Sequence, residues 1–386
     1  MPARKKVMIV FGTRPEAVKL APIILALAES DDFVPFVAVT AQHREMLDQV
    51  TGLFGIAPDA DLDIMRPRQT LAEITTRALT GLDELVAKER PDAMMVQGDT
   101  TTTFVGALAA HYHQVPVVHV EAGLRTFNRY SPFPEEMNRR LTSQLTSLHL
   151  APTPASCANL VAEGLERQSI VVTGNSVIDA LLWTVGKRVA YDDPALEVLD
   201  TDERRVLLVT AHRRESWGER MAAVGRALGR IARAEPDLRV VLPVHRNPTV
   251  REVLLPPLEG LPNVIVTDPI DYGGFARLID RAHLVLTDSG GVQEEAPSLG
   301  KPVLVMRENT ERPEAVTAGT ARLVGTDEDR IVNEVATLLR DEAAYSAMAS
   351  AVNPYGDGHA APRSVAALAH LFGLGPAAPE FHGQSL

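Results

Sequence analysis

Residues 7–28 read VMIVFGTRPEAVKLAPIILALA, an apolar run that stops at a glycine and continues into a helical stretch. The run Val7–Phe11 has the length and the β-branched composition of a buried parallel strand. Gly12 permits a tight turn, and Pro15 suits the first turn of a helix. The stretch therefore predicts a strand, a short turn and a helix over Glu16–Ala28, which is the repeating unit of α/β proteins.

The same alternation continues through the rest of the chain. Further strands are expected in the first half at Val34–Thr40, Ala93–Gln97, Val117–Glu121 and Leu148–Ala151, and in the second half at Val206–Thr210, Val240–Val244, Val264–Val266, Leu284–Thr287 and Val303–Met306. The pattern restarts after residues 186–204, which are charged and irregular. We therefore expect an α/β protein of two Rossmann-like domains with parallel sheets, at residues 1–176 and 177–358, with an active site in the cleft between them.

Composition limits the functions that are possible. The 386 residues are 45% hydrophobic and fit two domains of ordinary size. A net charge of −12 argues against nucleic acid as a partner. Cys157 is the only cysteine, which fits a reducing compartment, and no stretch of ~18 residues is apolar enough to cross a membrane, so we expect a cytoplasmic protein. The tail after Phe372 is rich in Gly, Pro and Ala and is expected to fray.

Three carboxylates follow predicted strands or begin a predicted helix. Asp99 lies in QGDTTTT, Glu121 ends the strand in HVEAGLR, and Glu135 lies in SPFPEE. Asp99 could instead be a helix N-cap, and Glu135 could simply favour a helix dipole. Glu121 should point into the crevice, because it closes an apolar strand beside a glycine. Together the three acids indicate proton-transfer chemistry.

Two segments have the features of anion sites. Arg14 and Lys19 lie near a predicted helix N-terminus that could hold a diphosphate, although two solvated cations on a capped helix would look the same. The segment is neither a Walker A loop nor a GxGxxG fingerprint. In the second half, Ser289-Gly290-Gly291 leads from a strand into a helix, a turn that lets backbone N–H groups approach an anion. Glu295 could then reach ribose hydroxyls.

Two further residues of the second half follow strands, namely His212 in TAHRRE and Arg312 in TERPE. His212 could contact a phosphate or donate a proton near neutral pH. No HExxH or Cys/His ligand spacing is present, so we expect no catalytic metal. A GxSxG motif is also missing, which argues against a serine hydrolase.

Several of these blocks together resemble a known family. The blocks are FGTRPEA (residues 11–17), GDTTT (98–102), EAGLR (121–125), HRRE (212–215), DSGG with QEE (288–295) and NPYGDG (353–358). They resemble the non-hydrolysing UDP-N-acetylglucosamine 2-epimerases of bacteria, from about Val7 to about Arg363.

The resemblance implies a glycosyltransferase-B-like fold, with a C-terminal helix at residues 359–373 that returns to the first domain. It also implies a cofactor-free elimination, in which UDP leaves C1 as a base removes the C2 proton. Re-addition to the 2-acetamidoglucal then gives UDP-N-acetylmannosamine, a precursor for cell-surface polysaccharides. By motif, the catalytic residues would be Asp99, Glu121, Glu135 and His212, and UDP would be held by Arg14, Lys19, Ser289, Gly290, Gly291, Glu295 and Arg312.

The resemblance further implies a homodimer and, in many members, activation by a second UDP-N-acetylglucosamine. The matching positions here are Gln42, Arg68, Glu135, Arg213 and His245. Some members carry a glutamine at the position of Glu45, and this departure weakens the regulatory assignment.

Three alternatives stay open at this stage. A hydrolysing epimerase would use the same pocket but let water capture the intermediate. A glycosyltransferase would pass the sugar to an acceptor, and the three carboxylates argue against it without deciding the matter. A non-catalytic nucleotide-sugar sensor would leave the acids at the strand ends without a purpose, since burying them costs free energy.

Overall fold

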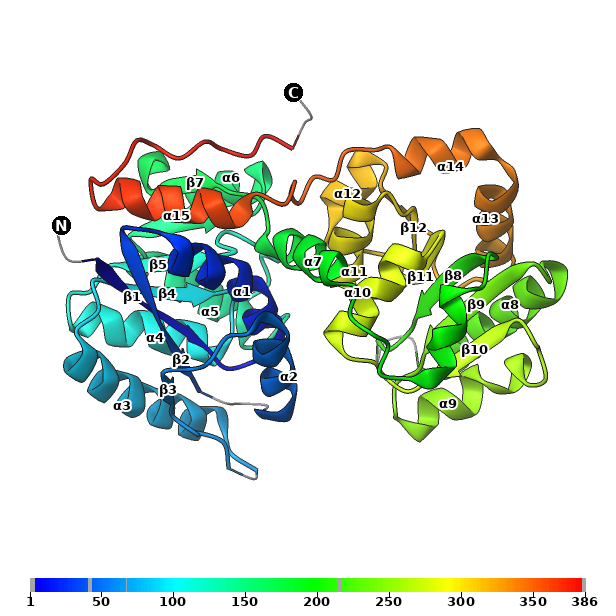
Figure 1. Cartoon of the computed structure of the whole chain (residues 1–386), viewed down its shortest axis with the longest axis horizontal. Coiled ribbons are helices and arrows are strands. Elements are labelled where there is room, and N and C mark those ends of the chain that lie inside the picture. The colour runs from blue at the N-terminus through cyan, green and yellow to red at the C-terminus, as the bar shows by residue number, and fades with distance from the viewer. Residues whose placement is uncertain (1–3, 41–43, 67, 214–216, 384–386) are drawn as a thin grey trace. The chain divides into compact units, whose positions relative to one another are not determined.

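The computed structural model describes residues 4–40, 44–66, 68–213 and 217–383, and it divides into two compact units (Figure 1). The first unit runs to Ala180 and resumes from Tyr355 to Gly383, and the second comprises Leu181–Pro354. The chain therefore passes between the units twice, once inside helix α7 (Ser176–Lys187) and once between Pro354 and Tyr355.

A parallel sheet forms the centre of the first unit, with strand order β3-β2-β1-β4-β5-β6-β7. The strands are β1 Lys5–Phe11, β2 Phe33–Val39, β3 Ala60–Asp61, β4 Ala93–Gln97, β5 Val117–Val120, β6 Leu148–Ala151 and β7 Ile170–Val172. The helices besides α7 are α1 Arg14–Glu29, α2 Arg44–Phe54, α3 Leu71–Glu89, α4 Thr101–Tyr112, α5 Glu135–Leu145, α6 Pro154–Ala162 and α15 Ala360–Leu371. Helices α3, α4 and α5 pack side by side, and α1 packs on α2 and α15 (Figure 1).

The second unit repeats this plan, with parallel strand order β10-β9-β8-β11-β12-β13. Its strands are β8 Arg205–Thr210, β9 Leu238–Pro243, β10 Val264–Thr267, β11 Leu284–Thr287, β12 Val303–Val305 and β13 Ala321–Leu323. Its helices are α8 Glu219–Ala234, α9 Pro248–Leu254, α10 Tyr272–Arg281, α11 Gly290–Glu295, α12 Pro313–Ala318, α13 Glu328–Arg340 and α14 Glu342–Ala349. The expected α/β class with parallel sheets is confirmed.

Burial on both faces explains why the central strands are continuous apolar runs. Val7, Met8, Ile9 and Val10 of β1 are all fully buried, so neighbouring residues that point to opposite faces both lie under helices. The central strand β8 of the second unit shows the same burial from Val206 to Val209.

Three strands were not expected from the sequence. They are β3, β7 and β13, which have only two or three residues each. They lie at or next to a sheet edge, where a short strand needs no long apolar run. Their pairing partners, rather than their own composition, make them strands.

The expectation that the tail after Phe372 frays is wrong for the described residues. The backbone N–H of Phe381 donates to the carbonyl of Val172 in the edge strand β7, at 2.8 Å. The Phe381 side chain is 5% exposed, and Arg167 forms an ion pair with Glu380 at 2.7 Å. The tail therefore covers the sheet edge at β7, which would otherwise offer unpaired backbone groups.

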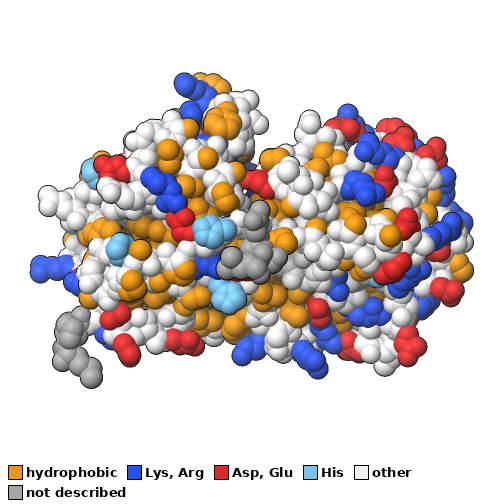
Figure 2. Space-filling model, turned by 90° about the horizontal axis from the view of Figure 1, so that it is seen from above, with side chains coloured by type: hydrophobic (Ala, Val, Ile, Leu, Met, Phe, Trp, Pro, Cys, Tyr) orange, Lys and Arg blue, Asp and Glu red, His pale blue; other side chains and the backbone are white. Residues whose placement is uncertain are grey.

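Charged side chains are mixed on the face shown in Figure 2, where Lys and Arg alternate with Asp and Glu. Ion pairs also join helices α8 and α13, since Arg226 and Arg230 of α8 both contact Glu328 of α13 at 2.9 Å. Among the described residues, no helix is both long enough and apolar enough to span a membrane.

The packed tail gives a stability test. We expect Phe381→Ala to lower the free energy of unfolding by about 3 kcal/mol, because a large buried side chain is lost. Leu374→Ala, in the same tail but 44% exposed, serves as the matched control and should change it by less than about 0.5 kcal/mol. Scanning calorimetry measures both, and equal transitions in the two variants would contradict the packing of the tail.

Candidate active site

Both sheets have a topological switch point, where the strand order reverses and ligands of open α/β sheets bind. In the first unit it lies between β1 and β4, and in the second between β8 and β11. The segments that follow these strands are 12–14, 98–100, 211–213 and 288–291. Seven of the residues expected from the sequence therefore lie at switch points, namely Arg14, Asp99, His212, Arg213, Ser289, Gly290 and Gly291.

Glu121 is the centre of the cluster in the first unit. Its backbone has φ +62°, in the left-handed region. This conformation costs a non-glycine residue about 1–3 kcal/mol, and residues that adopt it are concentrated at functional sites. Lys19 Nζ lies 2.5 Å from Oε1 and 2.6 Å from Oε2 of this carboxylate. The amide of Asn175 donates to Oε1 at 3.0 Å, and the amide of Gln97 donates to Oε2. The Glu121 side chain is 6% exposed, so the carboxylate is buried with three donors fixing its plane.

Asp99 follows the strand next to Glu121, because β4 pairs with β5 in register Gln97↔Val120. Its carboxylate forms an ion pair with Arg139 of α5 at 2.6 Å and is partly exposed. Its carbonyl accepts from the Asn138 side chain at 2.9 Å. The alternative interpretation of Asp99 as an N-cap is wrong, because Thr100 caps α4 by accepting from the N–H of Thr103.

Glu135 and Glu136 begin the same helix but have different surroundings. Glu136 is fully buried and accepts from the backbone N–H groups of Thr126 and Phe127, which fixes the loop before α5. Glu135 is half-buried, and no hydrogen bond or ion pair of its side chain is found among the described residues. Of the two acids, Glu135 is therefore the one whose carboxylate is available to a ligand.

Glu16 connects the two loops of the first switch point. One carboxylate oxygen accepts from the N–H groups of Gly12 and Thr13, at 3.1 and 2.8 Å, and the other accepts from the Thr100 hydroxyl at 2.8 Å. Burial raises the pKa of Glu16, and these hydrogen bonds oppose the rise. The capping-box spacing Thr13-x-x-Glu16 is the sequence signal that could have found this role.

Two buried histidines lie behind the cluster, side by side on β5 and β6 in register His119↔His149. His119 Nε2 lies 2.7 Å from the carbonyl oxygen of Gly98, in the loop that carries Asp99. Burial lowers the pKa of His119 to about 4 and that of His149 to about 3, so both are neutral at pH 7.

Asp288 organises the corresponding segment of the second unit. One of its oxygens accepts from the backbone N–H groups of His212 and Arg213, at 2.7 and 2.8 Å. The other lies 2.9 Å from Nδ1 of His212. Burial raises the pKa of Asp288, but the contacts with His212 and the hydrogen bond from the Arg213 N–H together outweigh it and lower the pKa overall. The imidazole is thus oriented through Nδ1, while the side chain is 45% exposed.

The glycine turn at the start of α11 borders the same place. A Cβ added to Gly290 would lie 3.8 Å from Arg213, and one added to Gly291 would lie 3.6 Å from Glu295. Glu295 is buried and accepts from the hydroxyl of Tyr272 at 3.1 Å. The turn therefore presents backbone groups beside one cation and one oriented carboxylate, which is a suitable arrangement for a nucleotide.

The remaining expected residues are more dispersed. Arg312 forms an ion pair with Glu294, and Arg213 lies 3.8 Å from Glu311. His245 is exposed and accepts from the N–H of Asn247 at 3.1 Å. Arg68 is exposed with φ +61°, and Gln42 lies outside the described residues.

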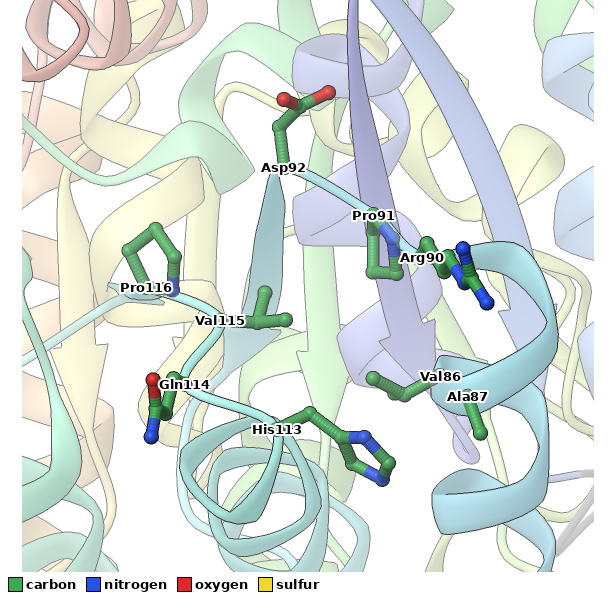
Figure 3. Close-up of a pocket in the computed structure, with 9 residues that line it drawn as sticks. All are labelled: Val86, Ala87, Arg90, Pro91, Asp92, His113, Gln114, Val115 and Pro116. Carbon is green, nitrogen blue, oxygen red and sulfur yellow. The ribbon is translucent and has the colours of Figure 1, made fainter.

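One pocket lies at the amino ends of the strands of the first sheet, opposite the end that carries the carboxylate cluster (Figure 3). It is lined by Val86, Ala87, Arg90, Pro91, Asp92, His113, Gln114, Val115 and Pro116. These residues border the amino ends of β4 and β5, whereas Asp99 and Glu121 follow the carboxyl ends, ~15 Å further along the strands. The pocket is therefore separate from the carboxylate cluster. No group of three or more His, Cys, Asp or Glu residues that could hold a metal is found in the part of the chain that the structure describes.

Comparison with known proteins identifies the family. The family model for UDP-N-acetylglucosamine 2-epimerase matches residues 25–369. This chain belongs to that family. It is 54% identical to the UDP-N-acetylglucosamine 2-epimerase of Escherichia coli K12, over 94% of this chain and 98% of the relative.

Solved structures of the epimerase family share the fold. The UDP-GlcNAc 2-epimerase of Neisseria meningitidis bound to UDP-GlcNAc has a TM-score of 0.84 and 47% identity, covering 95% of this chain and 100% of that one. The Methanocaldococcus jannaschii enzyme in complex with UDP-GlcNAc and UDP has a TM-score of 0.76 and 32% identity, covering 95% and 99%. A glycosyltransferase of kitacinnamycin, 14% identical with a TM-score of 0.64, shares the fold alone. The glycosyltransferase-B-like fold expected from the sequence is confirmed.

Sequence reasoning missed several residues of the candidate site. Gln97, Asn175 and Arg139 each bond to a predicted carboxylate, and Asp288 and Tyr272 orient a predicted histidine and glutamate. Asp288 could have been found, because it precedes the glycine turn directly. Asn175 could not, since nothing local relates it to Glu121, which is 54 positions away.

The buried histidines make stability depend on pH. Their pKa values are lower in the folded state than the ~6.5 of an unfolded chain, so the unfolded state gains protons first as pH falls. Stability should therefore be constant above about pH 7 and decrease from about pH 6.5 towards pH 4, by about 2 kcal/mol per histidine at pH 5.

Thermal unfolding of His149→Leu should show about half of this decrease between pH 7 and pH 5. His111→Gln, which replaces an exposed histidine, is the control and should keep the whole decrease. An equal pH dependence in His149→Leu and the wild-type protein would contradict the burial argument.

Proposed function

We propose that this chain interconverts UDP-N-acetylglucosamine and UDP-N-acetylmannosamine by non-hydrolysing epimerisation at C2. Family membership and the ligand-bound relatives support the substrate. The observation that carries the reaction is the buried Glu121 carboxylate, held by Lys19, with Asp99 in the loop after the adjacent strand. Inverting a carbon that bears a hydrogen requires proton removal on one face and return on the other, so the site needs more than one acid/base group.

The proposed reaction is an elimination followed by an addition. A carboxylate takes the C2 proton, its electron pair forms the C1–C2 double bond, and the C1–O bond breaks with its electrons on the UDP diphosphate. The 2-acetamidoglucal then receives a proton on the opposite face at C2, and UDP re-adds at C1. We assign the acid/base roles to Asp99, Glu121 and Glu135. The addition of a proton and UDP reverses the elimination, so the overall reaction requires no oxidant or reductant.

The environments of these carboxylates suit different tasks. The Lys19 ammonium stabilises the ionised form of Glu121, which suits a base. Glu135 is half-buried without a charged partner among the described residues, so its carboxylate is open to a substrate.

We assign UDP binding to Ser289, Gly290, Gly291, Glu295 and Arg312 of the second unit, with Arg14 and Lys19 of the first. Leaving-group departure places negative charge on the diphosphate, where cations and backbone N–H groups stabilise it. His212 assists this step. Its Nδ1 contacts Asp288, so the opposite ring nitrogen is presented to the diphosphate.

Regulation by a second UDP-N-acetylglucosamine is proposed on motif alone, at Gln42, Arg68, Glu135, Arg213 and His245. A plain hyperbolic dependence of rate on substrate would contradict it. A homodimer and a product that supplies cell-surface polysaccharide synthesis belong to the same proposal.

The reaction is tested by incubating the protein with UDP-N-acetylglucosamine in D2O, without NAD or added metal, and recording proton NMR spectra. We expect the manno epimer with UDP still attached and deuterium at C2. Free N-acetylmannosamine together with UDP would show hydrolysis instead. Unchanged, undeuterated substrate would contradict epimerisation and favour sugar transfer to an acceptor.

The role of Glu121 is tested by Glu121→Gln, which keeps the size of the side chain and removes the base. We expect deuterium incorporation at C2 to fall about 10²- to 10⁴-fold, the usual contribution of general acid–base catalysis. Glu203→Gln, at an exposed position of the second unit, is the control and should keep wild-type exchange. Exchange within threefold of wild type in Glu121→Gln would contradict the assignment.

A further inference from the structure

The chain leaves the first unit through α7 and returns to it at Tyr355. Within the first unit, these two segments are hydrogen-bonded to each other. Asn175 comes directly before α7, and its backbone N–H donates to the carbonyl of Tyr355 at 2.6 Å. Asp179 of α7 accepts from the N–H groups of Ala360 and Ala361 at the start of α15, at 3.2 and 2.8 Å. The start of α7 is therefore fixed to the returning chain.

The two backbones approach closely at this point, and glycines make the approach possible. A Cβ at Gly356 would lie 3.4 Å from the carbonyl oxygen of Asn175, and a Cβ at Gly174, where φ is +84°, would lie 3.3 Å from the Cα of Gly356. A contact of this kind has little freedom to slide. Residues attached to it are held in a defined position.

The side chains at the start of α7 reach the Lys19–Glu121 ion pair. The amide of Asn175 donates to Oε1 of Glu121 at 3.0 Å, and the Ser176 hydroxyl donates to the carbonyl of Lys19 at 2.6 Å. The amide oxygen of Asn175 accepts from the N–H of Val177 at 3.2 Å. Glu121 and Lys19 are thus hydrogen-bonded to two consecutive residues, Asn175 and Ser176, at the start of α7.

The bond from Asn175 has a specific geometric effect. Lys19 contacts both oxygens of Glu121, and a compact ammonium does not by itself fix the rotation of the carboxylate plane. Gln97 donates to one oxygen and Asn175 to the other, and together they remove this freedom. Because Asn175 is 3% exposed, water does not replace its bond.

We propose that Asn175 is a positioning residue for catalysis, which orients the Glu121 carboxylate and links its position to the return of the chain at Tyr355. The proposal rests on the function proposed above. Asn175 acts through Glu121 and not on the diphosphate, so its loss should reduce kcat while the KM for UDP-N-acetylglucosamine and the affinity for UDP stay unchanged.

The test uses Asn175→Ser and Asn175→Asp in the full chain. Both keep a side-chain oxygen that can cap α7, since Ser and Asp are good N-caps, but neither supplies the amide donor to Glu121. We expect a kcat about 10- to 100-fold lower in both, the loss that corresponds to a hydrogen bond to a charged group. The thermal midpoint should stay unchanged in Asn175→Ser, whereas Asn175→Asp, which places a second buried carboxylate beside Glu121, should lower it. Asp327→Ser makes a matched cap replacement at α13 in the second unit, where Asp327 accepts from the N–H of Arg330 at 2.8 Å, and should keep wild-type kcat.

Wild-type turnover measured beside the variants separates the two proposals. Absence of epimerisation in the wild type would overturn the proposed function and this inference with it. With an active wild type, kcat within twofold of wild type in both Asn175 variants would overturn this inference alone, as would a loss confined to KM. A fall in kcat that matches a fall in thermal midpoint, and that Asp327→Ser shares, would indicate a structural role and overturn it too.

Discussion

The buried ion pair between Lys19 and Glu121 is the interaction on which the candidate site depends. The two side chains are 18% and 6% exposed, so both charges have lost most of their water. Such a pair gives little net stability unless its remaining hydrogen-bonding groups are satisfied. Here the Gln97 and Asn175 amides satisfy the carboxylate. The left-handed backbone of Glu121 adds a further cost. An arrangement with these free-energy costs is better explained by a role in catalysis than by a contribution to stability.

The loops at the switch point are held together in the same way in both units. In each, a buried carboxylate ties together the loops that follow the two strands beside the reversal of order. Glu16 joins the loop after β1 to the loop after β4, and Asp288 joins the loop after β11 to the loop after β8. Loops at the carboxyl ends of strands carry no regular hydrogen bonds of their own, so a buried acceptor can hold several N–H groups in place. This fixes the loops without apolar packing and leaves their exposed sides to a ligand.

Much of the fold could be predicted because its rules are local. Buried parallel strands appear as apolar runs, and β4 and β11 coincide with the predicted Ala93–Gln97 and Leu284–Thr287. The short strands β3 and β7 and the packing of Phe381 could not be predicted, since each depends on an edge that the rest of the sheet supplies. A residue count of two or three gives no periodicity to detect.

The sequence by itself determined the class of the fold and the family, and it supplied the candidate acids, because strand ends and motifs consist of consecutive residues. Only the tertiary structure decided the partners of those acids. Asn175 reaches Glu121 across 54 positions, and Lys19 reaches it across 102. Such pairs form because parallel strands bring distant loops to one edge of the sheet, and strand order, which no local pattern encodes, sets which loops meet.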